Sequence, residues 1–212
     1  MFSRAEFKYA AKGNLTGNWS YLAGLTVIII ILSAIAGFIL GMIPIIGAIL
    51  LIFISTPFNF SEMLITIKLY KSEEIRVGDV FSGFNFTLKA VGLYLWVVLW
   101  TWLWSLLLII PGIIKSYSYS MSFFCLLNNP ELTIREAMRE SIRLTSGFKG
   151  DLFILDLSWL GWEILTIFTC GIGLLFLNPY IIQTKYITFR FLKEHSDGFV
   201  EPEEEIPGDT LY

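Results

Sequence analysis

The feature that most constrains this sequence is an uncharged apolar stretch from Tyr21 to Leu40. Its length matches the roughly 20 apolar residues that a helix needs to cross the hydrocarbon core of a bilayer. Basic residues precede it and residues 34–36 (Ala-Ile-Ala) resemble a cleavage site, but the apolar region continues to Ile54. A cleaved signal peptide has an apolar region of only about 7–15 residues. The sequence therefore predicts an uncleaved signal-anchor helix.

Composition extends this inference to the whole chain. Hydrophobic residues make up 55% of the 212 residues and charged residues only 16%, whereas a soluble domain has roughly 25% charged residues. This composition excludes a disordered chain, a coiled coil, a collagen-like fibre and a basic nucleic-acid-binding protein. We expect an all-α integral membrane protein with no nucleic acid as partner.

Six apolar segments, separated by turn signals, predict six membrane spans. The predicted spans are 21–40, 45–68, 88–110, 113–127, 152–177 and 180–192, the last being short for a full crossing. Breaks are expected at residues 41–44, 111–112 and 178–179, because proline disrupts the interior of a helix. The expected fold is a bundle of six helices in one membrane domain, residues 1–193. It consists of three Pro-broken hairpins, each preceded by an amphipathic cytoplasmic segment.

The distribution of charge predicts the orientation. Residues 194–212 hold seven acidic residues and no lysine or arginine, which is typical of a disordered acidic tail. In the six-span arrangement, 14 of the 15 basic residues lie on the side of the two termini and of the segments 68–89 and 131–151. Because basic residues concentrate on the cytoplasmic side, we expect both termini in the cytoplasm.

Residues 131–149 predict an amphipathic helix. Glu136 follows Thr133 by three residues, the spacing of a capping box. One face carries arginines at intervals of four residues: Arg135, Arg139 and Arg143. Two interpretations stay open, a helix lying in the membrane interface or a solvated helix packed on the bundle.

Similar strings recur and predict an internal repeat of three units. Residues 82–84 and 146–148 both read Ser-Gly-Phe, and residues 15–19 resemble the second of these regions. Residues 111–114 and 179–182 each begin with proline and end with two isoleucines. The alternative is chance similarity between apolar helices.

Charged residues inside the predicted spans are the candidate polar site: Asp156, Glu163, Glu62, Lys185 and Lys115. Each costs roughly 2.5–3.5 kcal/mol at the centre of a spanning helix. Asp156 and Glu163 are nearly two helical turns apart and so share one face. The functional interpretation is a hydrated pocket that binds a cationic group or a lipid headgroup, or exchanges a proton. In the structural interpretation, Asp156 pairs with Lys185, and Lys115 extends to the interface.

Other polar residues give weaker signals. Ser116 and Ser120 belong to a serine-rich span, which favours close helix packing, with a polar translocation path as the alternative. Cys125 and Cys170 lie in apolar stretches and predict buried thiols. With a single histidine, no metal-ligand spacing, no phosphate-binding glycine loop and no nucleophile motif, the sequence predicts a non-enzymatic protein without metal or cofactor.

Several strings carry a family resemblance. They are residues 79–84 (DVFSGF), 105–122, 129–133, 156–163 (DLSWLGWE) and 171–180. They resemble the bacterial membrane family catalogued as domain of unknown function 975, over residues 3–193. The chain is also distantly similar to the membrane part of some glycerophosphodiesterases, which is not their catalytic domain. The resemblance implies a bacterial cell membrane location and no established activity.

Two functions are consistent with these features. The first is a non-enzymatic accessory or interaction protein that engages membrane lipids, a membrane partner complex or a second copy of the chain. The second is a small transporter or lipid-translocating protein that uses Asp156, Glu163 and the serine-rich span. The small size and the three repeats in one orientation favour the first, because transporters commonly have inverted repeats.

Overall fold

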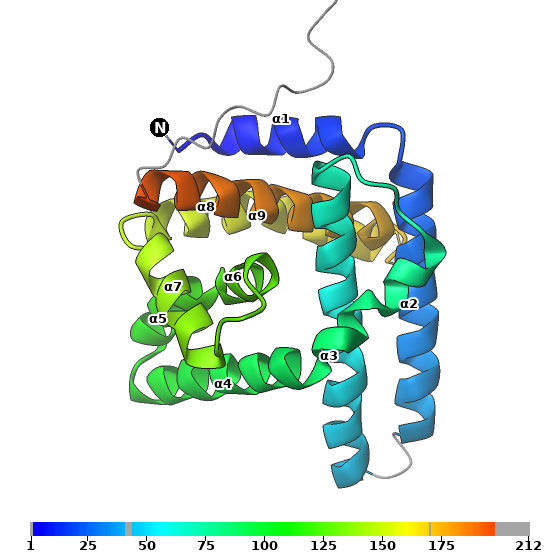
Figure 1. Cartoon of the computed structure of the whole chain (residues 1–212), viewed down its shortest axis with the longest axis horizontal. Helices are drawn as coiled ribbons and strands as arrows, with labels where there is room; N and C mark the ends of the chain where they lie inside the picture. Colours follow the sequence, from blue (N-terminus) through cyan, green and yellow to red (C-terminus); the bar gives the residue numbers. More distant parts are fainter. Residues whose placement is uncertain (1, 41–43, 170, 198–212) are drawn as a thin grey trace, which may run out of the picture.

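The computed structural model describes residues 2–40, 44–169 and 171–197, and these residues contain helices and turns but no β-strand (Figure 1). The predicted all-α class is therefore confirmed for this part of the chain. The helices are α1 (Arg4–Leu15), α2 (Trp19–Leu40), α3 (Pro44–Tyr70), the 3-10 helix η1 (Val77–Phe86), α4 (Thr87–Leu107), α5 (Ile109–Tyr119), α6 (Ser122–Asn128), α7 (Ile134–Leu144), α8 (Lys149–Phe168) and α9 (Leu174–Asp197).

Within the described residues, three helical segments are long and apolar enough to cross a membrane. They are Trp19–Phe38 in α2, Leu50–Tyr70 in α3, and Val77–Leu106, which joins η1 to α4. Large apolar side chains stay exposed along them, among them Phe38 at 82% and Trp102 at 62%. Contiguous exposed apolar surface of this kind marks a membrane or protein contact. The chain thus has the helices of a membrane-associated protein.

The six-span bundle is not confirmed. The fourth predicted span, residues 113–127, is divided between α5 and α6, which have 11 and 7 residues. At about 1.5 Å per residue, neither is long enough to cross a bilayer by itself. The fifth predicted span corresponds to α8, which carries three acidic residues: Asp151, Asp156 and Glu163.

The arrangement of the helices also differs from a parallel bundle. Figure 1 shows α2 and α3 running side by side, whereas α1, α8 and α9 run at a steep angle to that pair, near the end where α1 joins α2. The helix α9 packs against α1, α2, α3, α7 and α8. The helix α9 therefore joins the N-terminal helices to the C-terminal ones.

Apolar residues form two buried clusters on either side of α3. One joins α1, α2, α3 and η1 through residues such as Leu15, Leu22 and Val80. The larger one joins α3, α4 and the helices α5 to α9, and its centre includes Phe124 and Phe189. Because α3 contributes side chains to both clusters, this helix connects the N-terminal and C-terminal parts of the fold.

Two of the three predicted breaks are wrong in position. Pro111 lies in the first turn of α5, where its missing N–H needs no helical partner, and the actual break is at Leu108. Pro179 lies inside α9, and the chain turns instead before Leu174, in a segment that contains Gly171 with φ +84°. The break expected at residues 41–44 falls between α2 and α3, and residues 41–43 are outside the described part.

Two local predictions are confirmed and several fall outside the described residues. Thr133 and Glu136 form the predicted capping box at the start of α7. Cys125 is buried, as expected. The helix α9 continues to Asp197, beyond the predicted domain boundary at residue 193. The expected turn at residues 41–43, Cys170 and the acidic residues 198–212 lie outside the described part.

Candidate functional site

The two predicted carboxylates of α8 do not form one pocket. Asp156 lies 3.2 Å from the Lys185 amine on α9, and both side chains are more than one-third exposed. The hydroxyl of Tyr117, from α5, also interacts with Asp156. The structure thus brings together the pair that the structural interpretation expected, at the junction of three helices.

Glu163 lies apart from that pair. It is exposed on α8 and has no ion pair or side-chain hydrogen bond with another residue of the described part. Its backbone carbonyl accepts a hydrogen bond from the Thr166 hydroxyl. Trp162 beside it is 59% exposed, so this carboxylate belongs to the outer surface of the fold.

Lys115 and the serines of α5 are also not part of a polar path. The Lys115 amine lies 4.9 Å from the centre of the Trp104 ring on α4, a cation–π contact. The hydroxyl of Ser116 donates to the carbonyl of Ile113 and that of Ser120 to the carbonyl of Tyr117. These hydroxyls are therefore satisfied by their own helical backbone.

Glu62 is the one predicted residue that lies in a buried polar contact. It is only 8% exposed on α3, and its Oε1 accepts a hydrogen bond of 2.6 Å from the Asn178 amide on α9. The Thr26 side chain, from α2, lies beside the same carboxylate. Sequence reasoning missed Asn178 because the Asn-Pro pair was interpreted as a helix break.

Gln183, on α9, is a second buried polar residue that the sequence analysis missed. It is fully buried, and neither atom of its amide has a hydrogen-bond partner in the described part. The Glu62–Asn178 bond and the Tyr70–Tyr186 ring pair place it near the crossing of α3 and α9. A single glutamine in an amphipathic run gives no sequence signal for burial.

A polar cluster connects the N-terminal helix to the C-terminal hairpin. The Lys8 amine donates to the Ser158 hydroxyl at 2.7 Å and lies 3.7 Å from the centre of the Trp159 ring. The Tyr180 hydroxyl donates to the Lys8 carbonyl. Partial burial lowers the pKa of the Lys8 amine from its ordinary value. These contacts hold α1 against α8 and α9.

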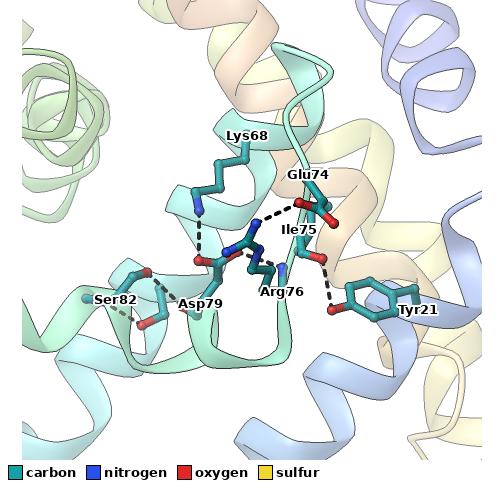
Figure 2. Close-up of polar contacts among 9 residues, drawn as sticks. Tyr21, Lys68, Glu74, Ile75, Arg76, Asp79 and Ser82 are labelled. Atoms are coloured by element: carbon teal, nitrogen blue, oxygen red, sulfur yellow. Dashed lines mark hydrogen bonds and ion pairs between the residues drawn. The ribbon is translucent and has the colours of Figure 1, made fainter.

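The connection between α3 and α4 is organised by Asp79 (Figure 2). Its carboxylate lies 2.7 Å from the Lys68 amine at the end of α3 and accepts a hydrogen bond from the Arg76 backbone N–H. The Ser82 hydroxyl donates to the Asp79 carbonyl, and the Tyr21 hydroxyl donates to the carbonyl of Ile75. The string DVFSGF therefore has a local structural role in holding η1 against α2 and α3.

An open groove of about 520 Å³ lies between α6, α7 and the end of α9. Its polar lining includes Asn128, Asn129, Glu136, Arg139, Glu140, Arg143 and Lys193, and its apolar lining includes Leu144 and Phe189. The backbone N–H and hydroxyl of Thr133 bind the Glu136 carboxylate and lower its pKa. Among the described residues, no group of three or more His, Cys, Asp and Glu side chains is arranged to hold a metal ion.

A comparison with protein families decides the relationship of the chain. Residues 1–115 and 92–196 match the family described as "Protein of unknown function (DUF975)". The chain belongs to the DUF975 family. No curated protein and no solved structure matches it.

The two matched ranges of this DUF975 protein contain the polar features described above. The Asp79 connection and the Lys8 residue lie in the first matched range, and the groove of α6, α7 and α9 lies wholly in the second. The resemblance inferred from the sequence is thus confirmed over both halves of the chain. In the DUF975 protein the predicted charged residues of α3, α8 and α9 divide into the Asp156–Lys185 ion pair, the exposed Glu163 and the buried Glu62. Lys115 contacts the Trp104 ring, and the hydroxyls of Ser116 and Ser120 donate to nearby backbone carbonyls.

Proposed function

We propose that this protein is a non-enzymatic, multi-pass membrane protein that acts as an accessory or interaction protein and engages lipids or a membrane partner complex. The observation that carries the proposal is the exposed apolar surface along α2, α4 and α8. Its large members include Ile31, Phe38, Leu99, Trp102, Leu157 and Phe168. A soluble domain rarely leaves such contiguous surface uncovered.

The proposal includes the finer features of the sequence analysis. The protein resides in a bacterial cell membrane with both termini in the cytoplasm, because basic residues gather in the segments that flank the apolar helices. It has the three-unit organisation, which Gly17 and Gly147 support. Both adopt a positive φ, 88° and 86°, in the turn before a long helix.

Gentle purification from native membranes, followed by native mass spectrometry, tests the function. We expect a stoichiometric lipid or protein to remain bound to the chain. A matched sample stripped by repeated detergent exchange controls for loosely attached lipid. Protein that retains nothing before stripping, and that transports solute in liposomes, would contradict the accessory function and support a transporter.

The transporter alternative has one specific observation in its favour. Glu62, Asn178 and Gln183 are polar groups inside the α3–α9 contact, and the Gln183 amide has no partner in the described part. Transport through this contact requires Glu62. Loss of flux in Glu62→Gln with unchanged flux in Asp156→Asn would favour this alternative over the one based on α8.

A further inference from the structure

The groove between α6, α7 and α9 has a charge distribution that distinguishes it from the rest of the surface. Both carboxylates of its lining are already engaged. Glu140 binds the Arg143 guanidinium through both oxygens, at 2.6 and 3.1 Å. Glu136 accepts hydrogen bonds from the backbone N–H and the hydroxyl of Thr133.

Two cations of the groove make no ion pair. Arg139, on α7, and Lys193, on α9, form no salt bridge or hydrogen bond with another residue in residues 2–40, 44–169 and 171–197, although the charge of Arg139 helps to lower the pKa of the Glu136 carboxyl. They come from helices about 50 residues apart in the sequence and line the same cavity. Because the lining holds three cations (Arg139, Arg143 and Lys193) and two carboxylates (Glu136 and Glu140), the groove has an excess of one positive charge.

The other lining groups fit an anion with an organic substituent. Asn128 and Asn129 carry amide N–H donors in their side chains, and both belong to the lining. Leu132, Leu144 and Phe189 are the apolar side chains of the same lining. The volume, about 520 Å³, lies within the range of roughly 300–1,000 Å³ of small-molecule sites.

Phosphate is the anion that this donor set fits best. A guanidinium binds phosphate oxygens through two parallel hydrogen bonds, and an ammonium adds a point charge. The engaged carboxylates of Glu136 and Glu140 disfavour a highly charged anion in the same groove. A phosphodiester, with one negative charge, satisfies both conditions.

We propose that Arg139 and Lys193 bind the phosphate group of a phosphodiester in this groove. A phospholipid headgroup and a soluble phosphodiester share that chemistry. The lipid source rests on the proposed function, which places the groove beside a membrane. The phosphate site itself rests only on the groove.

Three probes test the site with the full chain in a non-ionic detergent. They are dioctanoylphosphatidylglycerol, dioctanoylglycerol, which has the same acyl chains without phosphate, and glycerophosphoglycerol, which has the same phosphodiester without acyl chains. We expect the phospholipid to bind at least about tenfold tighter than dioctanoylglycerol, because a hydrogen bond to a charged group contributes about 1.5–3 kcal/mol. Binding of glycerophosphoglycerol with similar affinity would assign a soluble phosphodiester, and no such binding would assign the lipid.

Variants of the groove separate specific binding from general charge. Arg139→Gln combined with Lys193→Gln should weaken phospholipid binding by about tenfold or more. Lys12→Gln removes an exposed basic residue of α1, outside the groove, and should leave the affinity within twofold. The conservative pair Arg139→Lys and Lys193→Arg should restore most of the binding, which shows that loss did not arise from misfolding.

Two results would overturn the inference. One is equal affinity for the phospholipid and dioctanoylglycerol. The other is an equal effect of Lys12→Gln and the double groove variant. Failure here is distinguishable from failure of the proposed function, because a stoichiometric protein partner in native mass spectrometry would support that function even if the groove bound no phosphate.

Discussion

Replacing Gly83 by alanine should destabilise the protein through a contact between η1 and α3. The Gly83 backbone N–H donates to the Ser61 hydroxyl at 2.9 Å, and that hydroxyl donates to the Pro57 carbonyl at 3.0 Å. A Cβ atom at position 83 would lie 2.1 Å from the Pro57 carbonyl oxygen and 2.7 Å from the Ser61 backbone nitrogen. Backbone atoms cannot move aside as a flexible side chain can, so η1 must separate from α3.

The expected magnitude follows from two contributions. Overpacking of a close contact costs about 1–3 kcal/mol. Loss of the Gly83–Ser61 hydrogen bond, with the Ser61 hydroxyl fully buried, adds about 1 kcal/mol. The free energy of unfolding should therefore fall by about 2–4 kcal/mol. In a chain of this size each kcal/mol lowers Tm by about 2–4 °C.

Thermal unfolding in detergent, followed by circular dichroism, measures this change. Gly78→Ala is the matched control, because Gly78 belongs to the same η1 and a Cβ there meets no atom within 4 Å. We expect a fall in Tm of roughly 5–15 °C for Gly83→Ala and little change for the control. Equal midpoints for the two variants would refute the argument from close approach.

Three further predictions test the polar contacts. Glu62→Ala leaves the buried Asn178 amide without an acceptor, so we expect chemical unfolding to show a loss about 1–3 kcal/mol greater than for Glu62→Gln. The Asp156–Lys185 pair is more than one-third exposed, so a double-mutant cycle should give a coupling below about 1 kcal/mol; a much larger value would contradict its exposure. The Glu136 pKa is lowered in the folded state, so its stabilisation is complete above the ordinary carboxyl pKa of about 4.3 and is lost as pH falls through the lowered value. Glu136→Gln should flatten that acid limb of the Tm–pH curve, and an unchanged limb would show that the capping box is not its origin.

Hydropathy and local spacing predicted the features that depend on neighbouring residues. The long apolar helices α2 and α3 follow from uncharged stretches, and the capping box at Thr133 follows from a three-residue interval. The break expected at Pro111 failed because a proline in a first turn is compatible with a helix. Sequence alone cannot distinguish that position from an interior one when both flanks are apolar.

The polar contacts depend on tertiary packing and were therefore only partly predictable. The Asp156–Lys185 pair was one of the stated interpretations, because both charges lay in apolar segments. The sequence does not predict that Asn178 contacts Glu62 or that Lys193 lines the same groove as Arg139. In both cases a long stretch of chain separates the two residues, and no sequence pattern connects them. The steep crossing of α3 and α9 that creates the first contact has no local signature.

The position of α1 has a consequence for biosynthesis. Its Lys8 carbonyl accepts from the Tyr180 hydroxyl, 172 residues later in the chain. At about 5–20 residues per second, a ribosome needs roughly 9–34 s to synthesise that partner. Until then α9 cannot cover the apolar face of α1, which is formed by Phe7, Ala11 and Leu15. This face must contact another apolar surface in the meantime. The helix α1 can thus reach its native position only after α9 has been synthesised.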